Sequence, residues 1–289
     1  DHRDLHSFPT RRSSDLAKSG VAAILAKDSE EAIAKAKQLL SVLPANNLET
    51  AGNDYYMEND AAVSADLKGI ELISSVADKE SVIELYKQFG TSAVTAIGSL
   101  NWRTAGFVAT NNGAKLTADD SAKIARFVTL CDAYSIPVVT FVDSEGFEKS
   151  SAAELAGSIR DSAKLAQAYA SATTAKIAVV TGKAYGSAYV ALASTAAGSD
   201  FTFAWEGAVI APTTPEAAVV FLNGVSEDNA KQAQEYADNE ADAFTAAANG
   251  YVDRVITAED TKSALTSAIE ATSSKRVVTP AKKHVNFVY

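Results

Sequence analysis

The sequence predicts an α/β protein whose sheet is largely parallel. Short runs rich in Val, Ile and Thr alternate, from about residue 93 onward, with longer amphipathic segments that open on helix-capping residues. Strands separated by helices of this length are joined by right-handed crossovers, which make neighbouring strands parallel. Hydrophobic residues form 47% of the chain and charged residues 21%, an ordinary balance for a globular protein with a sizeable core.

Residues 1–16 are expected to lie outside this fold. The stretch DHRDLHSFPTRRSSDL has neither helical nor strand periodicity, and it back-translates into the ligation end of a short-read sequencing adapter. A transit peptide is usually poor in acidic residues, whereas three Asp here balance three Arg. We therefore interpret residues 1–16 as an artefactual leader, which implies that the natural protein has other residues at this point.

The first predicted helix begins at a capping box. The Asp28 carboxylate is expected to accept from an amide of the first turn, and the Glu31 carboxylate from the amide of the cap residue. It ends at Pro44 and places four apolar residues on one face: Ile33, Ala36, Leu40 and Leu43. Residues 45–65 have no clear period and form a connection. The predicted division is therefore 17–65, a helix plus linker, followed by a domain over 66–289.

Five strands are predicted within the second domain: 93–100, 105–110, 136–142, 176–181 and 200–204. Helices begin at Thr117, and at a second capping box from Ser151 to Glu154 that precedes the apolar residues Leu155, Ile159 and Leu165. Ligands of such sheets bind beyond the carboxyl ends of the strands. Two loops are therefore candidates, residues 143–147 and residues 182–188.

The second loop contains Gly186, Ser187 and Ala188 just before an Ala-rich helical segment. Successive backbone N–H groups at a helix start can converge on one acceptor, which makes an anion or oxyanion site from small residues alone. The alternative is ordinary turn chemistry, because Gly-Ser is common at strand-to-helix turns. Neither a Walker motif, nor a dinucleotide fingerprint, nor a G-x-S-x-G elbow occurs.

Composition excludes several other classes of protein. The net charge of −10 and a pI near 4.9 oppose nucleic-acid binding, and no apolar run is long enough to insert in a membrane. The three histidines are His2, His6 and His284, in the leader and the tail, which argues against imidazole catalysis. The one cysteine, Cys131, lies on an apolar helical stripe and predicts a core residue, no zinc site, and a reducing, cytoplasmic setting.

Four consecutive motifs resemble the C-terminal half of biotin-dependent acyl-CoA carboxyltransferases, the family of acyl-CoA carboxylase beta subunits and methylmalonyl-CoA decarboxylase alpha subunits. The family's A-R-F-x-x-x-C-D-x-x-x-I-P, V-D-x-P-G-F, E-x-x-G-x-I-x-x-G-A-K-L and K-A-Y-G-G-A-Y segments correspond to residues 125–137, 142–147, 154–165 and 183–189. Similar closing segments are Trp205 and residues 215–219, 250–256, 274–276 and 282–286. Residues 21–47 resemble the last helix of the family's N-terminal half.

This resemblance implies a crotonase/ClpP-like superhelix of repeated β-β-α units with a largely parallel sheet. It implies transfer of CO2 between carboxybiotin and the α-carbon of a short acyl-CoA, either propionyl-CoA/methylmalonyl-CoA or acetyl-CoA/malonyl-CoA. The cofactor is biotin on a separate carrier protein, and a coenzyme A thioester is the substrate. Because the N-terminal half supplies most of the CoA surface, the chain alone is expected to be inactive.

The resemblance also assigns the site. Backbone amides of Ser187 and Ala188 become the oxyanion donors on the biotin side, and no metal takes part. The biotin and acyl groups are expected to lie against five residues: Gly146, Phe147, Gly186, Tyr189 and Val190. The side-chain alternative, a Ser187 hydroxyl nucleophile, needs a base such as Lys183 or a carboxylate.

The chain departs from the family at several points. Glu145 stands where the family has Pro, Ser187 and Ala217 each replace a glycine, and Asp161-Ser162 replaces a His-Gly-like pair. Val190 lies where some relatives carry Asp, so the acyl group stays open. A second class of function is thus a degenerate crotonase-like scaffold or a docking module for the biotin carrier.

The partners implied are a biotin carboxyl carrier protein, with either biotin carboxylase or membrane decarboxylase subunits, and further copies of the same chain with the active site between protomers.

Overall fold

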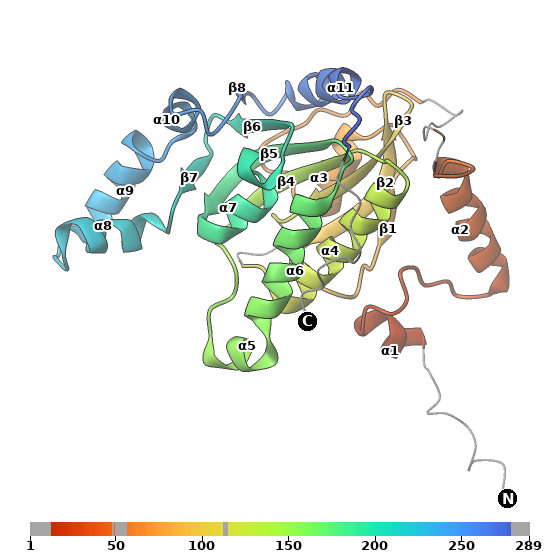
Figure 1. The fold of residues 1–289 in the computed structure, drawn as a ribbon, viewed down its shortest axis with the longest axis horizontal. Helices are drawn as coiled ribbons and strands as arrows, with labels where there is room; N and C mark the ends of the chain where they lie inside the picture. Colours follow the sequence, from red (N-terminus) through yellow and green to blue (C-terminus); the bar gives the residue numbers. More distant parts are fainter. Residues whose placement is uncertain (1–12, 48, 50–56, 112–114, 279–289) are drawn as a thin grey trace, which may run out of the picture.

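The computed structural model describes residues 13–47, 49, 57–111 and 115–278, and within them it contains one mixed sheet (Figure 1). The strand order is β1-β2-β3-β4-β5-β6-β8, and β7 pairs with β5 beyond this path. The β1–β2 and β2–β3 pairs are antiparallel, and every later pair is parallel. The strands are β1 Ile83–Leu85, β2 Val94–Leu100, β3 Arg103–Ala109, β4 Val138–Ser144, β5 Lys176–Tyr185, β6 Phe201–Trp205, β7 Val209–Ala211 and β8 Arg254–Ile256.

The α/β class and the five predicted strands are confirmed, with boundaries that shift by at most four residues. The sequence pattern did not predict β1, β7 and β8, since each has only three residues and offers too little alternation to recognise.

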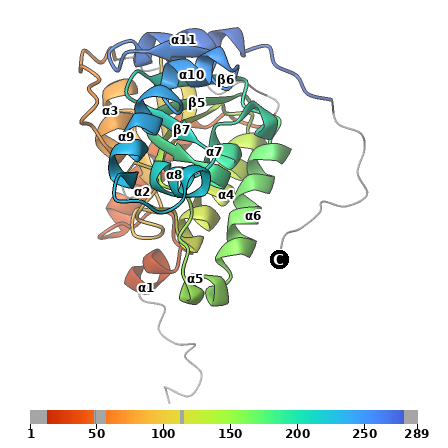
Figure 2. The same cartoon turned by 90° about the vertical axis from the view of Figure 1, so that its left-hand side faces the viewer.

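Helices cover both faces of the sheet (Figure 1 and Figure 2). They are α1 Ser13–Lys18, α2 Ser29–Val42, α3 Gly69–Val76, α4 Ala118–Ala133, α5 Ser151–Ala156, α6 Ser158–Ser171, α7 Gly186–Leu192, α8 Pro215–Asn223, α9 Asn229–Asn239, α10 Ala243–Ala248 and α11 Thr261–Ala271. α3 and α11 lie on one face, where their side chains pack with Phe141 and Val179. α4, α6 and α7 lie on the other face, against Val138 and Val180. Burial on both faces explains why these strands are apolar at nearly every position.

The predicted core role of Cys131 is confirmed. Its side chain on α4 is fully buried in the same cluster as Phe127 and Val128. A Cβ added to Gly106 of β3 would lie 2.5 Å from the Cys131 sulfur, so helix and strand are in close contact here. Burial raises the pKa of the thiol well above its usual value, which makes Cys131 unreactive.

Capping follows the predicted chemistry fully at the start of α4 and in part at the start of α2. The Thr117 hydroxyl accepts from the Asp120 amide, and the Asp120 carboxylate accepts from the Thr117 amide, a complete capping box. At α2, Asp28 accepts from the Glu31 amide, but the Glu31 carboxylate reaches past the cap to the Lys27 amide at 2.8 Å.

The apolar face predicted for α2 is wrong for three of its four residues, since only Leu43 packs on the core. Ile33 and Leu40 are 57% and 70% exposed, and Ala36 is exposed as well. The neighbouring face, with Leu39 and Val42, packs on the core instead. The cause is tertiary: the Val42 carbonyl accepts a hydrogen bond from Thr104 of β3, which fixes the rotation of the helix on the sheet.

The second predicted capping box is displaced by one residue. Ser150, and not Ser151, is the cap, with its hydroxyl accepting from the Ala153 amide. Gly157 then adopts a φ of +92° and separates α5 from α6. Because the chain turns at this glycine, the expected apolar stripe is divided: Leu155 and Ile159 are exposed, and only Leu165 is buried.

The predicted boundary after Leu16 falls inside a helix, since α1 runs from Ser13 to Lys18. Ala17 is buried, and the Leu16 carbonyl accepts from the amides of Val21 and Ala22. The expectations for residues 1–12, for residues 50–56 of the predicted connection and for the segment 282–286, which contains His284, lie outside the described residues. Among the helices that the structure describes, none combines the length and apolarity needed to cross a bilayer.

Candidate active site at the carboxyl edge of the sheet

The two predicted loops lie side by side because β4 and β5 are parallel neighbours. Their pairing is regular up to Val142 and Val180, but the next pair is Ser144 with Ala184. β5 therefore carries extra residues at this point, and the backbone ladder is interrupted where the two loops meet. The interruption places residues 182–188 beside residues 143–147.

The first loop is held tightly on its other side. The Gly146 carbonyl accepts from the Leu116 amide at 2.9 Å, and Glu148 donates to the Leu116 carbonyl at 2.8 Å. Ser144 closes the turn through its hydroxyl, which contacts both the N–H and the carbonyl of Gly146. Gly146 has a φ of +110°, a conformation that favours glycine, and Phe147 packs against the core. The predicted binding residues Gly146 and Phe147 are thus in a rigid turn.

The second loop ends where α7 begins. Gly186 is the first helical residue, with a φ of +58°, and a Cβ there would lie 3.1 Å from the Pro212 carbonyl. Ser187 has an ordinary helical backbone, so its replacement of a glycine causes no strain. It is exposed, whereas Ala188 is completely buried. Both amides belong to the first turn, whose N–H groups lack acceptors within the helix itself.

Tyr189 and Val190 follow on the same helix but face different surroundings. The Tyr189 hydroxyl donates to the Tyr251 carbonyl at 2.9 Å, and burial raises the pKa of this phenol to about 12. Tyr189 therefore anchors α7 to the chain that precedes β8. Val190 is 52% exposed, and Ser187, one turn earlier on the helix, is exposed as well. Of the five predicted contact residues, Val190 is the most open to a ligand.

An ion pair connects the two loops. The Lys183 ammonium lies 2.7 Å from the Glu145 carboxylate, and the Lys183 amide donates to Asp143 at 2.8 Å. The hydrogen bond to Glu145 raises the pKa of Lys183. Sequence reasoning missed this pairing, because the residues are 38 positions apart and nothing local relates them.

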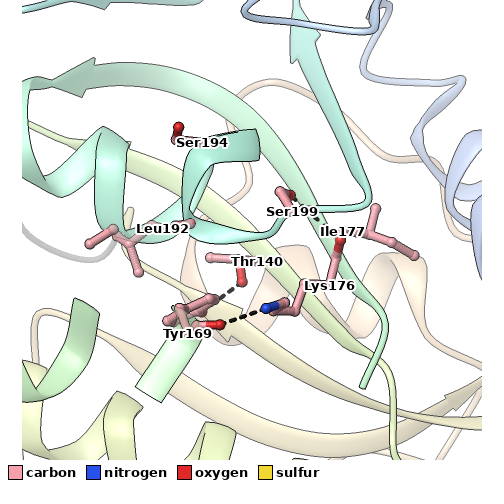
Figure 3. A pocket seen from close by; sticks show the side chains of 9 residues that line it. Thr140, Tyr169, Lys176, Ile177, Leu192, Ser194 and Ser199 are labelled. Carbon is pink, nitrogen blue, oxygen red and sulfur yellow. Dashed lines mark hydrogen bonds between the residues drawn. The ribbon is translucent and has the colours of Figure 1, made fainter. Parts of the chain in front are cut away.

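Two other features of the structure were candidates for a site. The first surrounds Lys176 at the start of β5, between α6 and α7 (Figure 3). It has no room for a water-sized molecule, and the Lys176 ammonium donates to the Tyr169 and Ala172 carbonyls. Burial lowers the pKa of Lys176. This lysine satisfies the C-terminal carbonyls of α6 and is structural.

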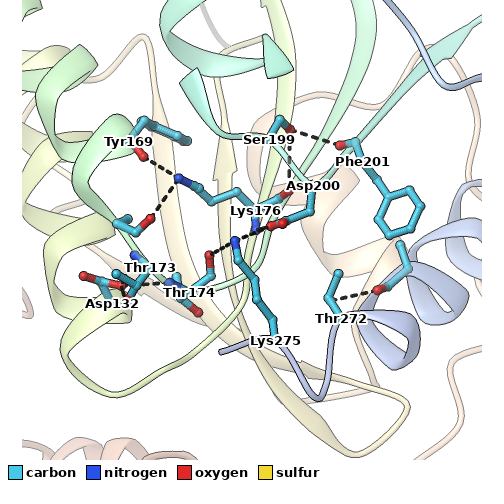
Figure 4. Close-up of polar contacts among 12 residues, drawn as sticks. Asp132, Tyr169, Thr173, Thr174, Lys176, Ser199, Asp200, Phe201, Thr272 and Lys275 are labelled. Carbon is cyan, nitrogen blue, oxygen red and sulfur yellow. Dashed lines mark hydrogen bonds and ion pairs between the residues drawn. The ribbon is translucent and has the colours of Figure 1, made fainter. Parts of the chain in front are cut away.

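The second is a cavity of about 320 Å³ at the opposite, amino edge of the sheet. Its wall includes Lys275, which binds Asp200 at 2.8 Å and the Thr174 carbonyl at 3.0 Å (Figure 4). Arg103, also in the wall, pairs with Glu270 at 2.9 Å. Two cations of the wall are thus paired with carboxylates, and Arg276, also in the wall, donates to the Lys275 carbonyl. The cavity lies at the other edge of the sheet, away from both loops.

Comparison with known proteins identifies the family to which the chain belongs. A family model described as "Carboxyl transferase domain" matches residues 14–287. The chain belongs to the carboxyl transferase domain family. The match begins at residue 14, inside the segment interpreted as a leader, in agreement with α1.

Two curated relatives with similar sequences carry names that refer to methylmalonyl-CoA. The methylmalonyl-CoA carboxyltransferase 12S subunit of Propionibacterium freudenreichii subsp. shermanii is 35% identical over 94% of this chain and 56% of its own length. The methylmalonyl-CoA decarboxylase subunit alpha of Veillonella parvula is 33% identical over 93% of this chain and 56% of its own length. The chain thus spans little more than half the length of these relatives.

A crystal structure of the transcarboxylase 12S hexamer assembly, with methylmalonyl-coenzyme A and methylmalonic acid bound, superposes with a TM-score of 0.87. It is 35% identical, and the match covers 96% of this chain and 57% of the 12S chain. The predicted crotonase-type fold of the carboxyl transferase domain is therefore confirmed.

Proposed function

We propose that this chain supplies the biotin-facing part of a carboxyltransferase site, which moves CO2 between biotin and the α-carbon of a short acyl-CoA. The observation that carries the proposal is the start of α7 at the carboxyl edge of the sheet. There Gly186, an exposed Ser187 and a buried Ala188 present first-turn amides beside the Gly146 turn. Ser187 is exposed and has a small side chain, which leaves room beside the first turn of α7.

The residues present fit a neutral carbonyl acceptor such as the ureido group of biotin. Two N–H donors at a helix start stabilise negative charge as it develops on an oxygen, without reorganisation, by about 3–4 kcal/mol per donor. Biotin supplies the carboxyl group. This chain orients the acceptor oxygen through Ser187 and Ala188, and the Gly146 turn confines it from the side.

A nucleophilic Ser187 hydroxyl would need Lys183 or a carboxylate as its base. The hydrogen bond to Glu145 raises the pKa of Lys183 and keeps it protonated. The Glu145 carboxylate is itself engaged with the Lys183 ammonium. Neither group is therefore free to act as the base that a hydroxyl nucleophile requires.

The acyl group, the direction of transfer and the partners belong to the same proposal. Relatives named for methylmalonyl-CoA favour propionyl-CoA/methylmalonyl-CoA over acetyl-CoA/malonyl-CoA. A carrier protein brings the biotin, and a second copy of the chain faces the site, in keeping with the hexamer assembly of the 12S structure.

The test is carboxyltransfer by a chimera in which this chain replaces the corresponding part of a 12S-type subunit. We expect label to move from carboxyl-labelled methylmalonyl-CoA to free biotin. A folded, CoA-binding chimera without transfer would instead support the scaffold hypothesis. The parent 12S subunit serves as the positive control.

A further inference from the structure

We infer that Lys183 and Glu145 are positioning residues: their ion pair holds the Gly146 turn at a fixed distance from the start of α7. The inference deepens the proposed function and rests on it only for its kinetic readout. Neither residue touches the reacting atoms in this scheme. They act through the backbone that carries Gly146 and Ser187.

The first argument is the interrupted ladder between β4 and β5. Regular pairing stops after Val142, and one further pair, Ser144 with Ala184, follows after the shift. Beyond it the backbones of the two loops are not joined by the sheet. Past the Ser144–Ala184 pair, the relative position of the two loops depends on contacts other than strand pairing.

The second argument is that side chains bridge this gap. Asp143 and Glu145 are two positions apart, so in an extended chain both side chains project on the same side. Both meet Lys183, Asp143 at the amide (2.8 Å) and Glu145 at the ammonium (2.7 Å). A Cβ on Gly182 would lie 2.6 Å from the Asp143 carboxyl, so the chains approach closely at this point.

The third argument is where the bridge acts. Glu145 directly precedes Gly146, and Tyr185 is the residue before α7. A Cβ added to Gly146 would lie 3.8 Å from the Tyr185 carbonyl oxygen, so the Gly146 turn lies against this carbonyl. Lys183 stands two residues before Tyr185. A change in the ion pair therefore moves the Gly146 turn and the α7 amides relative to one another.

The chain-level test is hydrogen exchange of residues 143–147 and 182–188 in the parent and in Glu145→Gln, Lys183→Met and the double variant. The side chains are partly exposed, 30% and 52%, so we expect faster exchange by about two- to fivefold, the range of exposed pairs. The double variant should exchange no faster than either single one, and Lys183→Arg should behave as the parent. Glu235→Gln, which breaks the exposed Lys231–Glu235 pair on α9, is the matched control.

The kinetic test uses the chimera. Glu145→Gln should raise KM for free biotin about two- to fivefold while KM for the acyl-CoA stays constant. The separate variant Lys183→Arg keeps the ion pair and should keep the parent value. A purely structural role would not separate the two KM values. Unchanged exchange in both single variants overturns the inference. If the variants alter hydrogen exchange but the parent chimera transfers no carboxyl group, the proposed function is refuted. The coupling of the two loops by the ion pair then still stands.

Discussion

At the residue scale, the site depends on how little side chain surrounds two amides. Ala188 is completely buried at the start of α7, whereas Ser187 is exposed to solvent. A larger side chain at position 188 would therefore clash with its surroundings. The Ser187 hydroxyl has no role in the proposed mechanism. These two neighbours should respond to substitution in opposite ways.

We predict that Ala188→Val lowers carboxyltransfer by about two orders of magnitude, the effect of losing one oxyanion donor. Ser187→Gly should retain or raise it, because the amide stays in place. Steady-state kinetics of the chimera, with circular dichroism to confirm folding, would measure both. A folded but inactive Ser187→Gly protein would show that the hydroxyl is required.

Lys123 gives a residue-scale prediction about stability. It is buried on α4, donating to the Ala93 carbonyl at 2.7 Å, and burial lowers its pKa to about 8 from an ordinary 10.5. Between these values the unfolded chain binds more protons than the folded one. The free energy of unfolding should therefore rise with pH from about 8 to 10.5 on account of this group.

The measurement is urea unfolding at several pH values in this range for the parent and for Lys123→Met. The free energy of unfolding of the parent, minus that of Lys123→Met, should increase as pH rises. The contributions of other titrating groups are the same in both proteins and cancel in this difference. Parallel curves would mean that Lys123 keeps an ordinary pKa in the folded state.

At the element scale, the helix start at Thr117 was predictable, because capping depends on residues three apart. The Thr117–Asp120 box formed as the pattern indicated. Asp120 also accepts from the Ala93 amide at 3.0 Å, which connects the helix start to the turn before β2. The bond from Ala93 to Asp120 joins elements that are distant in sequence, so local sequence patterns do not predict it.

We predict that Thr117→Ala lowers the free energy of unfolding by about 1 kcal/mol, the typical cost of removing a side-chain cap. Thr129→Ala is the matched control, since Thr129 is exposed within the same helix and should tolerate Ala without loss. Chemical denaturation followed by far-UV circular dichroism distinguishes them. Equal stability of the two variants would contradict a capping role.

At the scale of the whole molecule, α8 and α9 extend away from the sheet (Figure 1). Apolar side chains of α8 and of the turn after it remain exposed. Ala218 and Val219 of α8 are buried, but Phe221 is 87% exposed and Val225 beyond it is 88% exposed. Exposed apolar surfaces of this kind mark contacts with other proteins. A further copy of the chain is the partner that we expect here.

We predict that the chain self-associates and that Phe221→Ser with Val225→Ser reduces association. Sedimentation velocity over a range of concentrations would show the change. Gln234→Ser with Asp238→Ser on the neighbouring α9 provides a control that removes no apolar surface. A parent chain that stays monomeric at every concentration would contradict the prediction.

The sequence by itself determined the order of the main strands and helices and the position of both candidate loops. It also placed the small residues at the start of α7. Hydrophobic period, capping pairs and the Gly186 turn are relations between near neighbours, so one chain read in order is enough to find them.

Only the tertiary structure decided which face of α2 is buried and that Lys183 meets Glu145. It also decided that α1 includes part of the supposed leader. Each of these depends on how distant segments pack: the Thr104–Val42 bond rotates α2, and the shifted register of β4 and β5 brings residues 145 and 183 together. Such contacts depend on three-dimensional register, which local sequence patterns do not specify.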